Sequence, residues 1–534
     1  MSDLRSRSCY RWMNLAKSAR AGAVWRLCSL HNKNIHTTDC EVRKFLSLRV
    51  LALPGVAAPR PKGAGMPSAS PSANPILDES DDRRGLSTAD IVFFVLAGVA
   101  PMGVVVAVLT VSIARGTGAG VPGSYVVAGA ILALFSAGYI RMSRRVTNVG
   151  GFYTFADLGL GRRAGGATAL IAVVAYNAAT IGIFGSLVYF GASVATELLG
   201  LSVPWQAVAI ISLILVATLS YFEVTASARV LGVALAAEVL ILLAFSVAVL
   251  ARLGFHGFSL NVFAPSLVFG SGFGISLMLA FGSYVGFEAT SLYGEEADMP
   301  HRSVPRATYI SLAIITVFYI LISWAAISAY GVADAQRAAA ADTENFVFTA
   351  STRFLGQGAT DAMAVLVVTS LFAAFLAFHC NTARYHVALA REGLLPACLA
   401  KIDPRHNSPV IASAAQLALV IVFTVGFTVA GQDPYLSMGV SLYGLGVLGI
   451  VLLQGIASAA IVGYFLRNRE TESTLGAIIA PALAVAGFVA ALILMVANYP
   501  TLTDSTATWI NSLPWALPIA GAVGALLAGK RVRR

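Results

Sequence analysis

The chain has 534 residues, of which 57% are hydrophobic and only 12% are charged, and its mean hydropathy is +0.78. A soluble globular domain carries roughly 25% charged residues, so this composition excludes an ordinary soluble protein and predicts an integral membrane protein. The formal net charge of +10 could indicate a nucleic-acid partner, but the distribution of Lys and Arg along the chain indicates membrane topology instead.

The first 85 residues differ from the rest of the chain. Up to about Gly65 they are Arg-rich and irregular, and a Ser/Pro/Ala linker, "MPSASPSANP", follows at 66–75. We expect either a disordered cytoplasmic tail or a start codon placed too far upstream, with Met66 as the true first residue. An Arg-rich, acid-poor opening is also typical of a mitochondrial transit peptide. The remainder, residues 86–530, is predicted to be one helical membrane domain.

Twelve apolar runs follow the tail, each near the ~20 residues that a helix needs to cross the hydrocarbon core. They span 87–112, 122–141, 165–198, 203–222, 225–251, 270–294, 305–330, 358–390, 409–430, 436–466, 474–497 and 512–529. The third and eighth are long enough for tilted helices, and all are too long and too uniform for β-barrel strands. The predicted fold is therefore an all-α integral membrane protein with about 12 transmembrane helices.

The positive charges favour one side of this predicted bundle. Of the 24 Lys and Arg residues after position 82, 20 fall in segments on the same side as the start of the first helix. The 4 on the other side are Arg115, Arg252, Arg337 and Arg353. The positive-inside rule then predicts that both termini are cytoplasmic and that the protein lies in the plasma or inner membrane. Five cysteines without CxxC spacing indicate no disulfide framework, and we expect no metal ion and no cofactor.

Two of the apolar runs are interrupted. The first contains "LAGVAPMGV" (96–104), where Pro101 cannot donate a backbone hydrogen bond and disfavours helical angles at the residue before it. The sixth contains "FGSYVGFEA" (281–289). Either break alone is compatible with an ordinary kink, which transmembrane helices tolerate. Breaks in the first and sixth helices indicate a 5+5 inverted repeat with discontinuous helices 1 and 6, the architecture of many secondary transporters.

Interrupting a helix frees backbone groups that must face a cavity or a ligand, because lipid cannot pair with them. The N–H groups after Pro101 suit a carboxylate, and the carbonyls around Gly282 suit a protonated amine. An α-amino acid carries both charges and would satisfy both breaks. The substrate-binding candidates at the breaks are Gly98, Ala100, Pro101, Met102, Gly103, Phe281, Gly282, Ser283 and Gly286. Tyr176 and Asn177 of the third helix are candidates to line the same cavity, or to pack between helices.

Glu238 lies at the midpoint of the fifth run, among wholly apolar neighbours. An ionisable residue at the bilayer centre costs at least ~2.5–3.5 kcal/mol, so we expect it to face the bundle interior. A carboxylate in that position suits a proton carrier, and the alternative is an inward polar contact. Three further candidates for coupling or gating each have a structural alternative. Glu288 either gates the sixth-helix break or caps its second half, and His379 and Asn381 of the eighth helix either relay protons or join neighbouring helices.

Several stretches resemble the amino acid–polyamine–organocation (APC) permeases. "GFEATSLYGEEADMPHRSVPRA" (286–307) is similar to the sixth-helix signature of that family, and "NVGGFYTFADLGLG" (148–161) resembles the loop after its second helix. "NTARYHVALAREGLLP" (381–396) and "TASARVLG" (225–232) resemble the end of its eighth helix and the start of its fifth. In this family the two broken stretches line the substrate pocket. In some members a Lys near the position of Glu238 stands where sodium sits in related transporters.

One departure from the family pattern concerns the first break. Many members carry a Gly-Ser-Gly type sequence there, whereas this chain has Ala-Pro-Met-Gly at 100–103. The break is retained, but the resemblance gives less support to the same backbone grip on a substrate carboxylate. The assignment of a substrate by resemblance is weakened accordingly.

The breaks and the resemblance together predict a secondary active transporter of amino acids that works by alternating access. Proton-coupled symport and exchange (antiport) are the expected modes, and sodium coupling stays open. A polyamine or organic-cation permease would need an acidic pocket, for which the sequence offers only Glu238 and Glu288 at depth. A receptor of the same fold that binds ligand without transport is the other alternative. An enzyme is not expected, because the sequence has no HExxH motif, Walker A motif or convincing catalytic triad.

Overall fold

The computed structural model describes residues 87–145, 151–222, 228–287, 300–406, 408–468 and 473–531. The predicted tail (1–85) and the candidate Glu288 lie outside these residues. The remaining predicted elements fall within one compact unit, residues 82–534.

The described residues form helices joined by short connections, with no β-strand among them. Nine of these helices are long and apolar enough to cross a membrane, and Pro101–Arg115, Trp205–Tyr221 and Phe273–Ser283 are shorter apolar helices. The predicted all-α membrane fold is thereby confirmed. The helices that fall in predicted runs two to twelve are α7 (Val121–Ser143), α9 (Arg162–Leu199), α10 (Trp205–Tyr221), α11 (Ala228–Gly257), α13 (Phe273–Ser283), α14 (Pro300–Tyr330), α17 (Gln357–Arg391), α18 (Val410–Val429), α19 (Val440–Arg467), α20 (Ala480–Thr503) and α22 (Ala516–Arg531).

Five α-helices in the described connections were not predicted: α8 (Gly151–Leu160), α12 (Pro265–Val268), α15 (Ala335–Ala341), α16 (Phe346–Phe354) and α21 (Thr508–Asn511). They are too short to span a bilayer, so a search for long apolar runs passes over them. Each buries at least one apolar residue, as Phe152 and Phe155 of α8 show.

The first predicted run is broken in the structure. It forms α4 (Thr88–Gly98), then α5 (Pro101–Val104), a π-helical segment (Val105–Leu109) and α6 (Thr110–Arg115). Ala100 joins α4 to α5 in the left-handed region, with φ 51° and ψ 66°. That conformation costs an L-residue about 1–2 kcal/mol, so the chain changes direction here rather than bending gently.

The sixth predicted run also stops early. The helix α13 ends at Ser283, and a turn follows from Tyr284 to Phe287, with Gly286 at φ 108°. Glycine adopts this backbone angle without the steric cost that a Cβ would bring. The continuation of the run beyond residue 287 lies outside the described residues.

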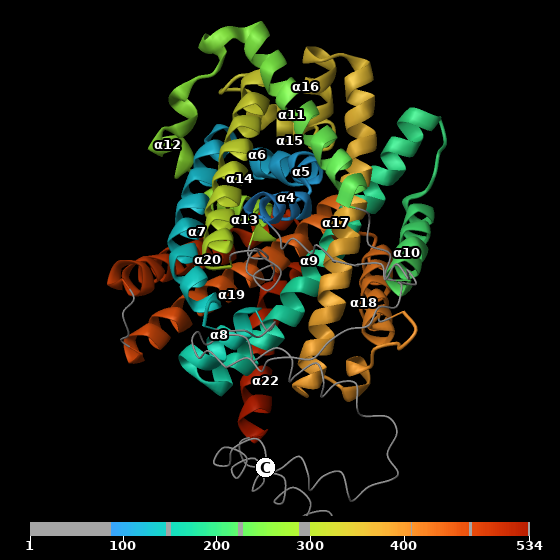
Figure 1. Ribbon diagram of the computed structural model, residues 1–534. Helices are drawn as coiled ribbons and strands as arrows, with labels where there is room; N and C mark the ends of the chain where they lie inside the picture. Colours follow the sequence, from blue (N-terminus) through green and yellow to red (C-terminus); the bar gives the residue numbers. More distant parts are fainter. Residues whose placement is uncertain are drawn as a thin grey trace, which may run out of the picture. The chain divides into compact units, whose positions relative to one another are not determined.

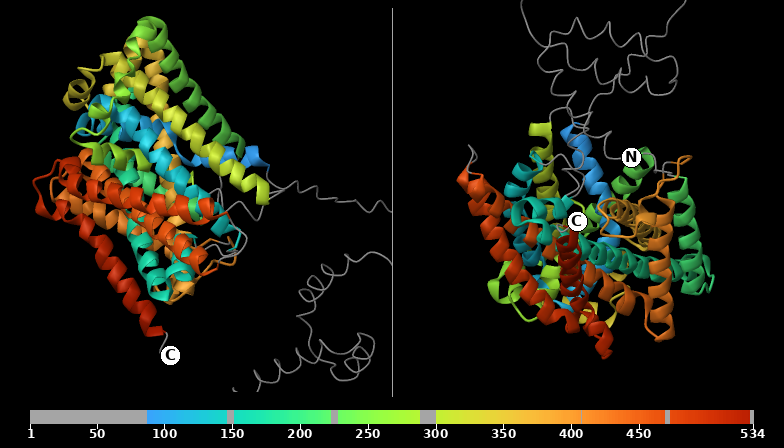
Figure 2. Two further views of the ribbon diagram at one scale, coloured as in Figure 1. Left: turned by 90° about the vertical axis from the view of Figure 1, so that its left-hand side faces the viewer. Right: turned by 90° about the horizontal axis from the view of Figure 1, so that it is seen from below.

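The two interrupted helices lie inside the bundle. Figure 1 shows α4, α5 and α13 at its centre, while α9 packs against α17, α19 and α22. The left view of Figure 2 shows the long α14 beside α11, and these helices are in contact. The centre of the bundle is therefore formed where both helices are broken.

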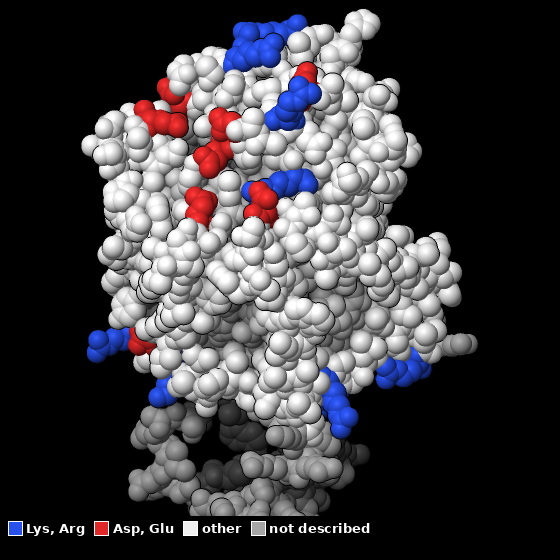
Figure 3. Space-filling model, turned by 180° about the vertical axis from the view of Figure 1, so that it is seen from behind, with Lys and Arg blue, Asp and Glu red and all other residues white. Residues whose placement is uncertain are grey.

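The outer surface of the bundle is apolar. Large hydrophobic side chains are exposed on the peripheral helices, among them Ile210, Val247, Val317, Val422 and Ile493. On the face shown in Figure 3, charged residues gather towards two ends, with an uncharged band between them. A surface of this kind is unfavourable in water and suits the hydrocarbon core of a membrane.

Candidate functional site

The break in the first helix is held by a carboxylate from the fifth. Glu238, on α11, is only 5% exposed and accepts the backbone N–H of Met102 at 3.0 Å. Ser370, on α17, donates its hydroxyl to the same carboxylate oxygen at 2.9 Å and accepts the N–H of Gly103 at 3.2 Å. The first free N–H groups of the helix Pro101–Arg115 are therefore paired with side chains from two other helices.

This arrangement bears on the predicted substrate contacts. Met102 and Gly103 were expected to offer N–H groups to a substrate carboxylate, and in this structure both groups are already bonded. Glu238 faces the bundle interior, as its sequence position predicts. A carboxylate is favoured here by the partial positive charge at a helix N-terminus, which is the property that led us to expect an anion at this place.

The break in the sixth helix is held by the tenth. The carbonyl of Gly282 accepts the Tyr443 hydroxyl, from α19, at 2.9 Å. Ser283 donates to the carbonyl of Leu279 at 3.0 Å, and its hydroxyl also lies 3.1 Å from that of Tyr125. The backbone groups freed at this break are thus partly paired within the protein.

A cavity lies between the two breaks and is partly open to solvent. It is lined by residues of five predicted spans: Val99, Ala100, Gly103, Val104, Ala107, Val108, Val111, Ile183, Ser186, Leu279, Gly282, Val285, Leu371, Ala374, Phe378, Gly439, Val440 and Tyr443. Of the predicted substrate residues, Ala100, Gly103 and Gly282 line this cavity.

The other predicted substrate residues do not line it. Gly98 lies in the last turn of α4, and Gly286 lies in the turn after α13. Met102 is fully buried, and Pro101 lines a second, apolar cavity with residues of α11 and α14. The Phe281 ring packs against Phe488, with 5.8 Å between ring centres.

Tyr176 and Asn177 also do not line the cavity. The Tyr176 ring lies 5.9 Å from that of Tyr385, and the Asn177 amide nitrogen lies 2.9 Å from Nε2 of His386. Both contacts join α9 to α17, which corresponds to the packing alternative that the sequence left open.

The candidates in the eighth helix lie elsewhere. His379 is fully buried between α17 and α18, with Nδ1 2.7 Å from Gln416 Oε1 and Nε2 2.7 Å from Ser413 Oγ. These contacts join the two helices. Asn381 is exposed and does not line the cavity. A relay role for either residue remains a prediction.

Sequence reasoning missed most of the cavity wall. Eight of the residues that it did not identify come from helices 3, 8 and 10: Ile183, Ser186, Leu371, Ala374, Phe378, Gly439, Val440 and Tyr443. The other seven come from helices 1 and 6: Val99, Val104, Ala107, Val108, Val111, Leu279 and Val285. Most are apolar residues within apolar runs, so nothing in the sequence separates them from lipid-facing neighbours. The one available signal was Tyr443, a tyrosine set among glycines in "GVSLYGLG" (439–446).

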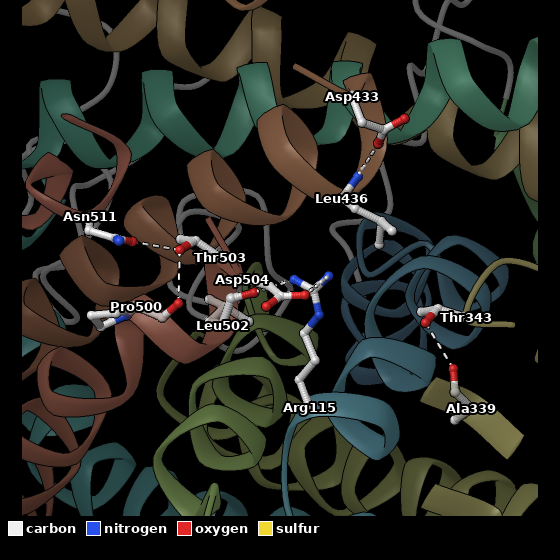
Figure 4. Close-up of polar contacts among 10 residues, drawn as sticks. All are labelled: Arg115, Ala339, Thr343, Asp433, Leu436, Pro500, Leu502, Thr503, Asp504 and Asn511. Carbon is white, nitrogen blue, oxygen red and sulfur yellow. Dashed lines mark hydrogen bonds and ion pairs between the residues drawn. The ribbon is translucent and has the colours of Figure 1, made fainter. Parts of the chain in front are cut away.

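The far end of the broken first helix is also anchored. Arg115, the last residue of α6, donates to the carbonyl of Leu502 at 2.6 Å, and its guanidinium lies 3.6 Å from Asp504. Figure 4 shows these contacts beside the end of α20, where Thr503 bonds to Asn511. The helix Pro101–Arg115 is thus held at its start by α11 and α17 and at its end by α20.

Comparison with known proteins identifies the family. The amino acid permease family model matches residues 86–524. The chain is 26% identical to the branched-chain amino acid permease BcaP of Bacillus subtilis (strain 168), over 63% of this chain and 73% of BcaP. It is 26% identical to the vacuolar cationic amino acid transporter 4 of Arabidopsis thaliana, over 67% of this chain and 60% of that protein.

Among solved structures, the Eremococcus coleocola manganese transporter is similar, with a TM-score of 0.48 and 12% identity over 84% of this chain and 96% of that one. At this TM-score the similarity adds nothing to the family assignment. The family model, in contrast, covers most of the chain and confirms the predicted resemblance. This chain is a multi-pass membrane protein that belongs to the amino acid permease family.

Proposed function

We propose that this permease moves an amino acid by proton-coupled alternating access, with Glu238 as the proton carrier and the cavity between the two breaks as the substrate site. The observation that carries the proposal is the contact of the Glu238 carboxylate with the N–H of Met102 and the hydroxyl of Ser370. The remaining points of the proposal are that the protein catalyses no reaction, lies in the cell membrane and has both termini in the cytoplasm.

The contact suggests how a proton is coupled to the substrate. Hydrogen bonds to an ionised carboxylate are roughly twice as strong as those to a neutral group. Protonation of Glu238 therefore weakens its hold on Met102 and leaves the positive end of the helix without a compensating charge. A substrate carboxylate that enters the cavity beside Gly103 can then interact with this helix end.

Protonation of Glu238 also frees the helices to move relative to one another. Glu238 lies on α11, Met102 begins the second half of the first helix and Ser370 lies on α17, so one carboxylate joins three helices. Loss of its charge loosens that junction once the proton has bound. We therefore propose that the proton binds first and the substrate second, and that both are released after the junction has opened to the other side.

A polyamine or organic-cation substrate is less well supported. Of the lining residues that the structure describes, none is Asp or Glu. The carboxylate of Glu238 is bonded to Met102 and Ser370 rather than lining the cavity. A cation without a carboxylate of its own would enter this cavity unpaired, at a large desolvation cost.

The proposal is tested by uptake into proteoliposomes of labelled amino acids and polyamines, under an inward proton gradient and with or without sodium. Glu238→Gln keeps the shape and hydrogen-bonding capacity of the carboxyl group but cannot ionise. Glu197→Gln, at an exposed carboxylate on α9, is the matched control. We expect wild type and Glu197→Gln to accumulate amino acid in response to the gradient, and Glu238→Gln to lose accumulation but retain exchange.

Each other result has a definite meaning. Accumulation that ignores the pH gradient, or that survives Glu238→Gln, contradicts the role of Glu238. Saturable binding without any uptake favours the receptor alternative. Uptake that requires sodium and ignores protons contradicts proton coupling while leaving amino acid transport intact.

A further inference from the structure

We infer that the cavity selects amino acids with uncharged aliphatic side chains and rejects those with cationic or acidic side chains. This inference rests on the proposed function, in which the cavity between the breaks carries the transported amino acid. It is drawn from the walls of the cavity, which are mostly apolar, whereas the groups at the breaks are polar.

The wall contributed by the first helix is an aliphatic stripe. Val104, Ala107, Val108 and Val111 all line the cavity, from α5 through the π-helical segment to α6. The stripe begins next to the break and extends towards α6. A substrate whose charged groups lie at the break would therefore extend its side chain along this stripe.

The facing walls are apolar as well. Ile183 of α9, Leu279 of α13, and Leu371, Ala374 and Phe378 of α17 line the cavity opposite or beside the stripe. A substrate side chain in this space contacts mainly hydrocarbon. Such a site gains free energy from each methyl or methylene group that it buries.

The described walls offer little hydrogen-bonding capacity to a polar side chain. The only side-chain hydroxyls among the lining residues described are those of Ser186 and Tyr443. Ser186 donates to the carbonyl of Gly182 at 3.4 Å, and Tyr443 donates to that of Gly282 at 2.9 Å. Both donors are engaged by backbone, so a substrate hydroxyl or amide oxygen would lose water without gaining a donor in exchange.

Charge gives the strongest discrimination. The lining residues in the described part of the chain include no Asp, Glu, Lys, Arg or His. The buried carboxylate Glu238 does not line the cavity, because it is held by Met102 and Ser370. The side-chain ammonium of lysine or the carboxylate of glutamate would be buried there without a partner, which is far more costly than burying a polar but neutral group.

The test is competition for labelled leucine uptake in proteoliposomes by matched pairs of unlabelled amino acids. Lysine is norleucine with an ammonium group in place of one hydrogen on its last carbon, and valine and threonine differ only in a methyl or hydroxyl group. We expect norleucine to compete at least about 100-fold more strongly than lysine. Valine is expected to compete about tenfold more strongly than threonine, in line with the discrimination that apolar pockets achieve.

A pair of variants locates the selectivity. Val108→Ala removes two methyl groups from the stripe, and Val367→Ala makes the same change at a buried position of α17 that does not line the cavity. Val108→Ala is expected to shift the preference between leucine and phenylalanine by about tenfold towards phenylalanine, the scale of a methylene-sized change in a pocket. Val367→Ala is expected to leave the preference unchanged, and an equal shift in both variants would contradict the assignment.

The outcomes separate this inference from the proposed transport function. Ligand-induced thermal stabilisation of the purified protein by norleucine and by lysine gives the same comparison without uptake. Lysine that competes or stabilises as well as norleucine overturns the selectivity and leaves transport standing. Stabilisation by norleucine alone, with no leucine uptake, supports the selectivity and contradicts transport. Stabilisation by neither contradicts both.

Discussion

Glu238 accepts the backbone N–H of Met102 at 3.0 Å, although 136 residues separate them along the chain. The contact places a buried carboxylate from the fifth helix at the start of the second half of the first. A helix N-terminus carries a partial charge of roughly +0.5, and in a bilayer it needs an anion or a polar partner. Glu238 supplies such an anion at the break in the first helix.

Removing the acceptor at this contact is expected to destabilise the fold. Glu238→Ala leaves the Met102 N–H without its partner, which costs about 1–3 kcal/mol for a buried group. Glu238→Gln retains an acceptor oxygen and is expected to remain near wild-type stability. Thermal unfolding of the purified variants measures the difference, and equal melting temperatures for the two would show that the N–H finds another partner.

Ser370 is predicted to link the carboxylate to the substrate cavity. Ser370→Ala removes the hydroxyl that bonds to both Glu238 and the N–H of Gly103, at an expected cost of about 1–3 kcal/mol because the buried N–H is left unpaired. We also expect the pH dependence of uptake to shift, since the carboxylate loses one hydrogen bond. Ser370→Thr keeps the hydroxyl and should restore both properties, and a failure of this rescue would indicate a packing role only.

Tyr443 is predicted to support substrate binding through the sixth-helix break. Tyr443→Phe removes the hydroxyl from the carbonyl of Gly282 and is expected to raise KM about five- to tenfold, since the loss of one hydrogen bond costs about 1–1.4 kcal/mol. The matched control is Tyr499→Phe, because Tyr499 donates in the same way to the carbonyl of Ser441 but does not line the cavity. Initial rates of uptake at varied substrate concentration measure KM. A similar rise in both variants would mean that the effect is on folding.

The backbone angle at Ala100 predicts a graded response to substitution. A left-handed φ of 51° is costly for a residue with a Cβ and is more costly for a β-branched one. Ala100→Gly is expected to fold at least as well as wild type, whereas Ala100→Val is expected to lose about 1 kcal/mol or more. The melting temperatures of the two variants are compared. A well-folded valine variant would show that the break does not require this conformation.

The connection between α17 and α18 contains a contact that depends on pH. His406 donates its backbone N–H at 3.2 Å to the carboxylate of Asp403, and its ring nitrogen Nδ1 lies 2.9 Å from the same oxygen. The pKa of Asp403 is lowered below its usual value, chiefly by the hydrogen bond with the His406 side chain. Hydrogen bonds from backbone N–H groups lower this pKa further. A lowered pKa means that the contact stabilises the folded state above the usual pKa of Asp and is lost as the pH falls through the lowered value.

Asp403→Asn is therefore expected to loosen this connection at neutral pH and to make no difference once the wild-type carboxylate is protonated. The rate of limited proteolysis between α17 and α18 measures this, compared at pH 7 and at an acidic pH below the lowered pKa of Asp403, with an acid-active protease at the lower pH. An equal effect of the substitution at both pH values would contradict the role of the charge.

Much of the architecture could be predicted from the sequence because it depends on local properties. A run of about 20 apolar residues must cross the bilayer as a helix whatever its neighbours are. Pro101 interrupts the first run for a reason contained in its own ring, and Gly286 allows the turn after Ser283 because it lacks a Cβ. The inward position of Glu238 followed from the cost of a carboxylate in lipid.

The composition of the cavity was decided only by tertiary structure. Val108, Phe378 and Tyr443 come from three helices, and within an apolar run their neighbours in the chain look alike whether they face a cavity, another helix or lipid. Which of them faces the cavity depends on the rotation and tilt of each helix, and these are set by packing against the other helices. For the same reason the partner of Glu238 could not be read from the sequence: the N–H of Met102 becomes its neighbour only when the fifth helix packs against the break in the first.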